Sequence, residues 1–412
     1  MNMVSVDNAL PIFHRTWEPS SMAETIDRLV ERDWGWKTID LRLERIRHRL
    51  GVRGTVQYTA VFESRDIRQE VWLAGTTYAD GRAAGVARKL RTAAARAVPP
   101  LKSLVAFDPV HDMVFQVFPL DHKLPGALAF ACRDELSRWV PGEATLTPVR
   151  HRIGLSATLR TVLRSEISYV KFHRADEAHR SAARSKQLQR LSPENIGLAV
   201  PRAVIPDLEA TITDAAAGSR LDVLAGMGDE RAMAVVAEAL LGLHRSNADG
   251  LDDRSLVPEV RVRRSVDWLK FVMPEAGPMM DRLLDGPKPT EGEALVHGDL
   301  KPDHVFVDGD RVNLIDLDSA GRGRPLSDLA TLAVRLPFEQ QALLIEHYHR
   351  LAPRADWSAW RPEVAMASIK LALSHAQHRQ AGWPRAVWQA LLATDALCRQ
   401  GSPAGNSSCR GL

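Results

Sequence analysis

Alternating apolar and polar residues predict strands in two separate segments of the chain. One is IRHRLGVRGTVQYTAVF (Ile46–Phe62) and the other is VRHRIGLSATLRTVL (Val149–Leu163), and each reads as strand, short glycine-containing turn and strand. Each is followed by another apolar run, a small acidic turn and an Ala/Arg-rich stretch suited to a helix. We therefore predict two copies of a β-β-β-α unit. Chance similarity between two arginine-rich hairpins is the alternative.

The two copies differ at one position of chemical interest. Lys171 lies at the end of the third strand of the second copy, and it is the only lysine between Leu124 and Ser185. The corresponding place in the first copy falls near residues 75–76, which are Gly and Thr. If this lysine takes part in chemistry, only the second copy can supply it.

Helical periodicity replaces alternation from about Met227. Asp229–Arg245 has apolar residues at helical spacing and an acidic start, which suits the N-terminal end of a helix dipole. Further helices are predicted at Met22–Arg32, Ser327–Arg335, Phe338–Leu351, and as two long helices between Arg361 and Arg399 that are parted near GWP. The pattern predicts an α+β protein with a small β-containing lobe followed by a mostly helical lobe.

Composition and charge exclude several classes of protein. The 412 residues are 45% hydrophobic and 25% charged, an ordinary globular composition with enough material for two or three domains. The net charge is only +3 and basic residues are interleaved with acids, so a nucleic-acid partner is not indicated. Three cysteines without CxxC spacing argue against a disulfide framework or a zinc site and indicate a reducing cytosol.

The chain ends and the longest apolar runs bear on localisation. The N-terminus has no basic start followed by an apolar core, and no run approaches 18 apolar residues, so we expect a cytoplasmic protein with no membrane partner. The last dozen residues, GSPAGNSSCRGL, are small and polar and predict a flexible tail. The oligomeric state stays open.

Candidate chemistry is concentrated in Ala294–Ala330, which contains VHGDLKPDHVFVDGDRVNLIDLDSAGRG. A strand (HVFVD), a tight turn and a second strand (RVNLIDLD) form a predicted hairpin, which would bring Asp299 close to Asp316 and Asp318. One carboxylate of such a group can accept a hydroxyl proton, and another can hold Mg²⁺. Lys171 could pair with the α- and β-phosphates of a nucleotide. These groups meet the main needs of phosphoryl transfer.

This stretch resembles the aminoglycoside phosphotransferase and choline kinase-like family, which has a protein-kinase-like fold. The family pattern HGDxxxxN matches His297, Gly298 and Asp299, the later I-D-x-D/E pattern matches IDLD at 315–318, and D-L-A matches 328–330. The resemblance implies a bilobal fold that uses ATP or GTP with Mg²⁺. It also implies site roles for four types of group: the catalytic base Asp299, the metal ligand Asp316, the phosphate-binding Lys171, and the supports His297 and Asp328.

The chain departs from the family pattern at the expected asparagine, where it has His304. Mg²⁺ prefers oxygen ligands, so three interpretations remain open. The metal is held by Asp316, with or without Asp318, while His304 bonds a water or the loop; or the site favours Mn²⁺; or catalysis is lost. Asp318 either contacts metal or caps the following turn.

Two further positions bear on activity. The helix after Lys171 contains only Glu177, close to its start, so the glutamate that usually pairs with the strand lysine is missing or differently placed. In contrast, Lys301 follows Asp299 by two residues, as in Ser/Thr protein kinases, and would place a positive charge on the transferring phosphate. The retention of Asp299, Lys301, Asp316 and Lys171 together favours a working enzyme.

We therefore expect four segments: an N-terminal module (1–145), which is a candidate degenerate copy of the small lobe, a small lobe (146–215), a helical catalytic lobe (216–400) and the tail (401–412). The expected function is phosphorylation of a hydroxyl on a small molecule such as an amino sugar, amino alcohol, sugar or antibiotic. The alternatives are a pseudokinase that binds nucleotide or a partner protein, and a kinase that acts on Ser/Thr of a precursor peptide.

Overall fold

The computed structural model describes residues 6–65, 67–95, 105–130, 144–253, 258–285 and 292–400. It divides into two compact units. The first contains Met1–Ala182, Pro201–Asp214 and Gln377–Ala381, and the second contains Ala183–Val200, Ala215–Ala376 and Gly382–Leu412. The predicted flexible tail at 401–412, together with Cys132 and Cys409, lies outside the described residues, whereas Cys398 is buried. The predicted α+β class is confirmed.

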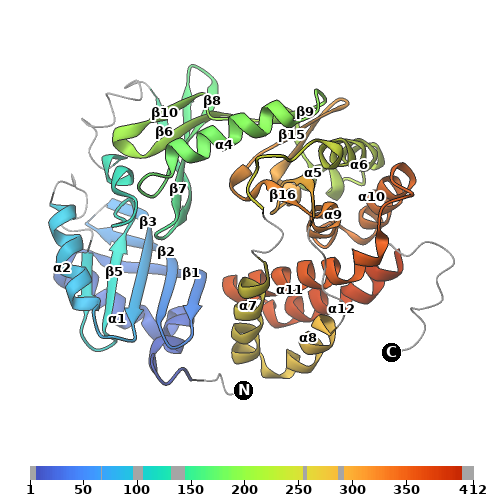
Figure 1. Ribbon diagram of the computed structural model, residues 1–412. Helices are drawn as coiled ribbons and strands as arrows, with labels where there is room; N and C mark the ends of the chain where they lie inside the picture. Colours follow the sequence, from blue (N-terminus) through green and yellow to red (C-terminus); the bar gives the residue numbers. More distant parts are fainter. Residues whose placement is uncertain are drawn as a thin grey trace. The chain divides into compact units, whose positions relative to one another are not determined.

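The first sheet of the first unit consists of five antiparallel strands: β1 (Lys37–Arg49), β2 (Arg53–Ser64), β3 (Ile67–Tyr78), β4 (Val105–Asp108) and β5 (Met113–Val117) (Figure 1). They lie in the order β1-β2-β3-β5-β4, and helix α2 (Ala83–Ala94) follows β3 along the chain. The first predicted hairpin is therefore confirmed, because β1 and β2 pair across the turn at residues 50–52.

The second sheet of the first unit also consists of five antiparallel strands: β6 (Thr145–Arg152), β7 (Ser156–Leu163), β8 (Glu166–Phe172), β10 (Ala203–Ile205) and β11 (Ala210–Asp214). They lie in the order β6-β7-β8-β11-β10, and helix α4 (Ala178–Leu191) follows β8. The two sheets thus share strand order, strand direction and the position of a helix after the third strand. After α4 the chain continues in the second unit, where β9 (Ile196–Leu198) joins another sheet.

The helix predicted at Met22–Arg32 is confirmed as α1 (Pro19–Trp34), which follows the short 3-10 helix η1 (Phe13–Trp17). Proline at the first helical position suits a helix start, because its missing N–H would have no partner there. One face of α1 is buried, and its Trp34 lies against Phe62 of β2 with ring centroids 5.5 Å apart. Burial of this apolar stripe, rather than helix propensity, holds α1 in place. The second sheet has its own core, which includes residues of the 3-10 helix η2 (Pro125–Phe130).

The second unit is mainly helical. Its helices are α5 (Leu221–Gly226), α6 (Glu230–Arg245), α7 (Pro258–Val272), α8 (Gly277–Leu284), α9 (Pro325–Ala333), α10 (Phe338–Leu351), α11 (Trp360–His378) and α12 (Trp383–Gln400). Four of the predicted helices are confirmed as α6, α10, α11 and α12, and α9 begins two residues before its predicted start. Asp229 caps α6, since its side chain accepts a hydrogen bond from the Ala232 N–H at 3.0 Å.

The strands of the second unit frame the predicted chemistry. Strands β12 (Ser219–Arg220), β14 (Val305–Asp308), β15 (Arg311–Leu314) and β9 form one sheet, and β13 (Ala294–Val296) pairs with β16 (Gly321–Gly323). The predicted β14–β15 hairpin is present, but its second strand ends at Leu314 and not at Asp318. Asp316 adopts a left-handed conformation (φ 61°), which stops the strand and starts the 3-10 helix η6 (Leu317–Ser319).

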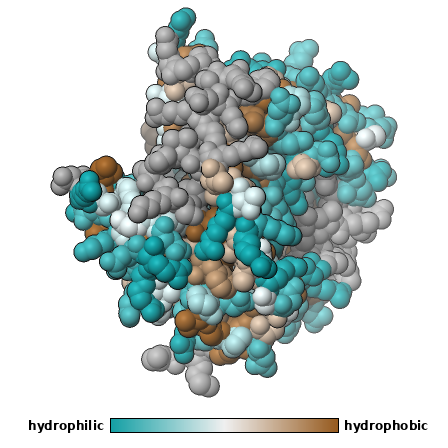
Figure 2. Space-filling view, turned by 90° about the vertical axis from the view of Figure 1, so that its left-hand side faces the viewer, coloured by the Kyte–Doolittle hydropathy of each residue, from teal (hydrophilic) through white to brown (hydrophobic). Residues whose placement is uncertain are grey.

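The face of the molecule drawn in Figure 2 carries interspersed hydrophilic and hydrophobic residues, with hydrophilic ones predominating. Among the described residues, no helix combines the length and the apolar character needed to cross a membrane.

Candidate active site

The predicted loop His297–Asp299 begins directly after β13. Its middle position, 298, requires a glycine. Gly298 has φ 79°, a conformation that residues with a Cβ rarely adopt. A Cβ at this position would lie 2.3 Å from the carbonyl oxygen of Ser319, in the segment that follows Asp316. The glycine therefore lets two segments pass in close contact, and it sets the distance between the loop and the IDLD segment.

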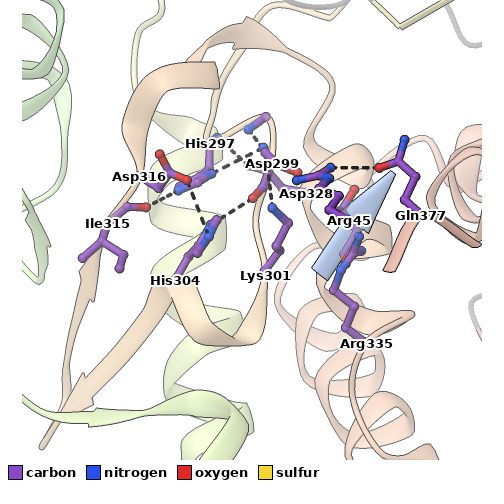
Figure 3. Close-up of polar contacts among 12 residues, drawn as sticks. Arg45, His297, Asp299, Lys301, His304, Ile315, Asp316, Asp328, Arg335 and Gln377 are labelled. Atoms are coloured by element: carbon purple, nitrogen blue, oxygen red, sulfur yellow. Dashed lines mark hydrogen bonds and ion pairs between the residues drawn. The ribbon is translucent and has the colours of Figure 1, made fainter. Parts of the chain in front are cut away.

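Asp328, in the first turn of α9, holds this loop. Its two carboxylate oxygens accept hydrogen bonds from the backbone N–H groups of His297 at 2.6 Å and Gly298 at 2.8 Å (Figure 3). Burial alone would raise the pKa of Asp328, but His244, His297 and the backbone donors hold that pKa below its ordinary value. His244 lies 3.5 Å from Asp328 and is itself hydrogen-bonded to the Tyr348 hydroxyl at 2.8 Å. The predicted supporting position of Asp328 is thus a buried, ionised anchor.

The His297 ring connects the loop to the end of β15. Its Nε2 lies 2.8 Å from the carbonyl oxygen of Ile315, so Nε2 carries the proton and donates it. Its Nδ1 is then free to accept the backbone N–H of Asp299 at 3.4 Å. The ring thereby fixes Asp299 in relation to the residue before Asp316.

Asp299 and Lys301 form an ion pair at the open side of the loop. The Lys301 Nζ lies 2.7 Å from the Asp299 Oδ2, and both side chains remain partly exposed (Figure 3). Burial would raise the pKa of Asp299, but Lys301, His304 and Arg335 lower it below its ordinary value. The carboxylate is therefore ionised at neutral pH and is in a state that can accept a proton.

His304 lies inside the loop and is 3% exposed. Its Nδ1 is 3.1 Å from the Asp299 carbonyl oxygen, which can only accept, so Nδ1 carries the proton. Its Nε2 lone pair therefore faces the Asp316 Oδ2, 3.7 Å away. Burial, with His297 and Lys301 nearby, lowers the pKa of His304 to about 4, so the ring is neutral at physiological pH.

The ligand atoms of His304 and Asp316 are of the types that bind a divalent cation. An imidazole lone pair and a carboxylate oxygen face each other, and a cation or a cation-bound water relieves that contact. The described residues contain no group of three or more His, Cys, Asp or Glu side chains that could hold a metal alone. Asp318 is exposed, and its carbonyl oxygen accepts a hydrogen bond from Arg184 at 3.0 Å.

Lys171 belongs to the first unit, on β8. It pairs with Thr158 of β7 and Thr211 of β11. In the first sheet the residue at the same register is Thr76, which pairs with Thr55 of β2 and Val114 of β5. Glu177 precedes α4 and lies 3.3 Å from Arg174.

Two cations near Asp299 were not among the residues singled out from sequence. Arg335, just after α9, and Lys370, on α11, both interact electrostatically with Asp299. Burial lowers the pKa of each, while Asp299 opposes that change. Neither residue belongs to a sequence motif. Only the packing of two helices brings them near the loop. A basic residue just after α9 and another on α11 were the sequence signal.

The chain matches a family model described as the phosphotransferase enzyme family over residues 152–363, which are 212 of the 412 residues. The chain belongs to this family. The match includes β7, β8 and the site residues from Lys171 to Arg335, whereas the first sheet lies before it and Lys370 after it. No curated protein matches the chain.

Solved structures with a similar fold include three phosphotransferases. An aminoglycoside-3'-phosphotransferase of type VIII is 21% identical, with 60% of this chain and 99% of that one covered at a TM-score of 0.46. A macrolide 2'-phosphotransferase from Brachybacterium faecium is 19% identical. The match covers 61% of this chain and 91% of that one, at a TM-score of 0.42. An ethanolamine kinase from Plasmodium vivax is 12% identical. The match covers 67% of this chain and 90% of that one, at a TM-score of 0.44.

Proposed function

We propose that this phosphotransferase moves the terminal phosphoryl group of ATP or GTP to a hydroxyl of a small molecule. The observation that carries the proposal is the fixed Asp299, an ionised carboxylate at the open side of a loop held by Asp328 and His297. In this role Asp299 accepts the proton of the attacking hydroxyl. Lys301, 2.7 Å away, turns to the transferring phosphate when nucleotide is present and balances its charge.

Asp316 and His304 are the residues that would hold a Mg²⁺ or Mn²⁺ ion, which would supply positive charge beside the nucleotide phosphates. The lone pair of His304 toward Asp316 supports this role, and it favours Mn²⁺ more than asparagine would, because imidazole nitrogen is a poor match for Mg²⁺. Lys171 is the proposed partner of the α- and β-phosphates. The turn between β6 and β7 is the proposed cover of the phosphates.

The basic side chains around Asp299 indicate which charge the acceptor carries. Many acceptors of related enzymes are amino sugars, which carry positive charge. Here Arg335 and Lys370 add positive potential beside the proposed base. We therefore favour a neutral or acidic hydroxyl compound over an amino sugar, because a cationic acceptor would be repelled. Glucosamine, galactose and galacturonate form a probe set of similar size, and preference for glucosamine would contradict this choice.

The decisive experiment measures ADP release from ATP with Mg²⁺ and with Mn²⁺, for wild type, Asp299→Asn and His304→Asn. Slow transfer to water needs no acceptor. Wild-type turnover that falls at least about 100-fold in Asp299→Asn would support the proposed base. His304→Asn should shift the preference from Mn²⁺ toward Mg²⁺. Nucleotide binding without turnover in wild type, with turnover restored only in His304→Asn, would instead establish a pseudokinase.

A further inference from the structure

The first sheet repeats the strand order of the second without its lysine. Register places Thr76 where the second sheet has Lys171, and the Thr76 hydroxyl is buried against Thr55 at 3.2 Å. Position 76 of the first sheet therefore lacks the cation that Lys171 supplies at the same register of the second sheet. The side chains on the face of Thr76 make other contacts, and these identify what the first sheet does.

Two side chains from that face of the first sheet bind the backbone of the second. Gln57 and Arg47 share the face of Thr55, since Arg47 pairs with Thr55 across β1 and β2, and Gln57 is two residues further along β2. The Gln57 Nε2 donates to the carbonyl oxygen of His151 at 3.0 Å, and the Arg47 Nη1 donates to that of Ile153 at 3.2 Å. Both acceptors lie at the β6–β7 turn.

Asp121, in the segment between β5 and η2, holds the same turn. Its Oδ2 accepts the backbone N–H of Gly154 at 2.6 Å and lies 3.1 Å from the His151 Nε2, while Oδ1 accepts the Lys123 N–H at 2.9 Å. Asp121 is 2% exposed. Burial would raise its pKa, but His151, Gly154 and Lys123 hold that pKa below its ordinary value. It is a buried, ionised anchor for one turn.

Asp121 holds the turn from the face opposite Lys171. His151 pairs with Ala157, and Lys171 pairs with the next residue, Thr158, so the two side chains point to opposite faces of the second sheet. The contacts of Asp121 with His151 therefore lie on the face away from Lys171. Phe118 adds to the support, with its ring 5.0 Å from that of His151.

We propose that the first sheet and the segment after it are a non-catalytic copy of the small lobe that braces the phosphate-covering β6–β7 turn, with Asp121 as the positioning residue. The inference rests on the proposed function. A turn that is ordered before nucleotide arrives loses less conformational entropy on binding, so the brace increases nucleotide affinity. The family model begins at residue 152, which is consistent with a support added outside the minimal enzyme.

A matched pair of substitutions tests this. Asp121→Asn removes the carboxylate from Gly154 and His151. Asp108→Asn is the control, because Asp108 is equally buried, accepts the Val110 N–H at 3.0 Å and contacts His111, all within the first sheet's own β4–β5 turn. Three measurements are made on each full-length variant. They are the urea midpoint, amide hydrogen exchange at residues 152–156 without nucleotide, and the dissociation constant of ATP with Mg²⁺ or Mn²⁺.

Both variants should lose comparable stability, but only Asp121→Asn should speed exchange at the turn and weaken ATP binding about tenfold, as expected for one lost charge-assisted hydrogen bond. Gln57→Ala, which leaves Asp121 intact, should also speed exchange at the turn and weaken ATP binding, but to a smaller extent. This variant tests the inference if Asp121→Asn fails to fold. Unchanged exchange at 152–156, or an equal loss of ATP affinity in Asp108→Asn, would overturn the inference. If wild type binds no nucleotide, the proposed function fails, whereas exchange still decides whether Asp121 holds the turn.

Discussion

The close contact at Gly298 gives a prediction that the structure quantifies. Gly298→Ala places a Cβ 2.3 Å from the Ser319 carbonyl oxygen, and ordinary contact begins near 3.4 Å, so the two segments must part by about 1 Å. Gly309→Ala, in the β14–β15 turn, is the control. It has a similar left-handed conformation (φ 62°), but a Cβ there meets nothing within 4 Å. Both substitutions carry the conformational cost of alanine at positive φ, about 1–2 kcal/mol.

The difference between the two variants isolates the displacement of the loop from the IDLD segment. Overlap at position 298 should add about 1–3 kcal/mol of destabilisation, the usual range for overpacking. A misplacement of about 1 Å between Asp299 and Asp316 should lower ATP turnover about 100-fold, against less than about threefold for Gly309→Ala. Urea unfolding and ADP release measure the two effects. Equal turnover in the two variants would refute the claim that Gly298 sets the spacing of the site.

Other supports of the site can be tested separately. Asp328→Ala leaves two buried backbone N–H groups without their acceptor and should lower the free energy of unfolding by about 2–5 kcal/mol; an unchanged urea midpoint would contradict its anchoring role. The pKa of His304 is about 4 in the folded chain and about 6.5 unfolded, so stability should fall by up to about 3 kcal/mol from pH 6.5 to 4. His304→Gln should reduce that loss in urea titrations across pH. Lys370→Gln should lower kcat/KM for galacturonate about fivefold more than for galactose, and equal effects would argue against an acidic acceptor.

Local patterns were sufficient to predict the elements around the site. The β14–β15 hairpin, helix α10 with its bounds, and the start of helix α6 at the acidic Asp229 are properties of short segments, and all three are confirmed. The error at the end of β15 has a local cause as well. Asp316 lies in an apolar run that reads as a strand, yet it adopts a left-handed conformation that alternation cannot reveal.

Contacts between distant segments were not predictable in the same way. The register of Thr76 against Lys171 could be estimated, because each lies near the end of the third strand of its unit. The contact of Asp121 with Gly154 could not, since it depends on how two sheets pack, and neither residue belongs to a motif. Lys370 is a similar case, because helix packing alone brings it into the field of Asp299.

The chemistry of His304 argues that its presence in place of asparagine alters the site without dismantling it. An asparagine amide offers a donor and an acceptor on one short side chain, and a neutral imidazole offers the same pair on opposite sides of a ring. In this chain the donor meets the Asp299 carbonyl oxygen at 3.1 Å and the lone pair faces Asp316 at 3.7 Å. The substitution thus keeps a loop-supporting hydrogen bond and a ligand directed to the proposed metal position, and it changes only the ligand atom from oxygen to nitrogen. A loss of function by drift would leave no reason for a buried ring with both nitrogens directed at the two residues on which the proposed catalysis depends.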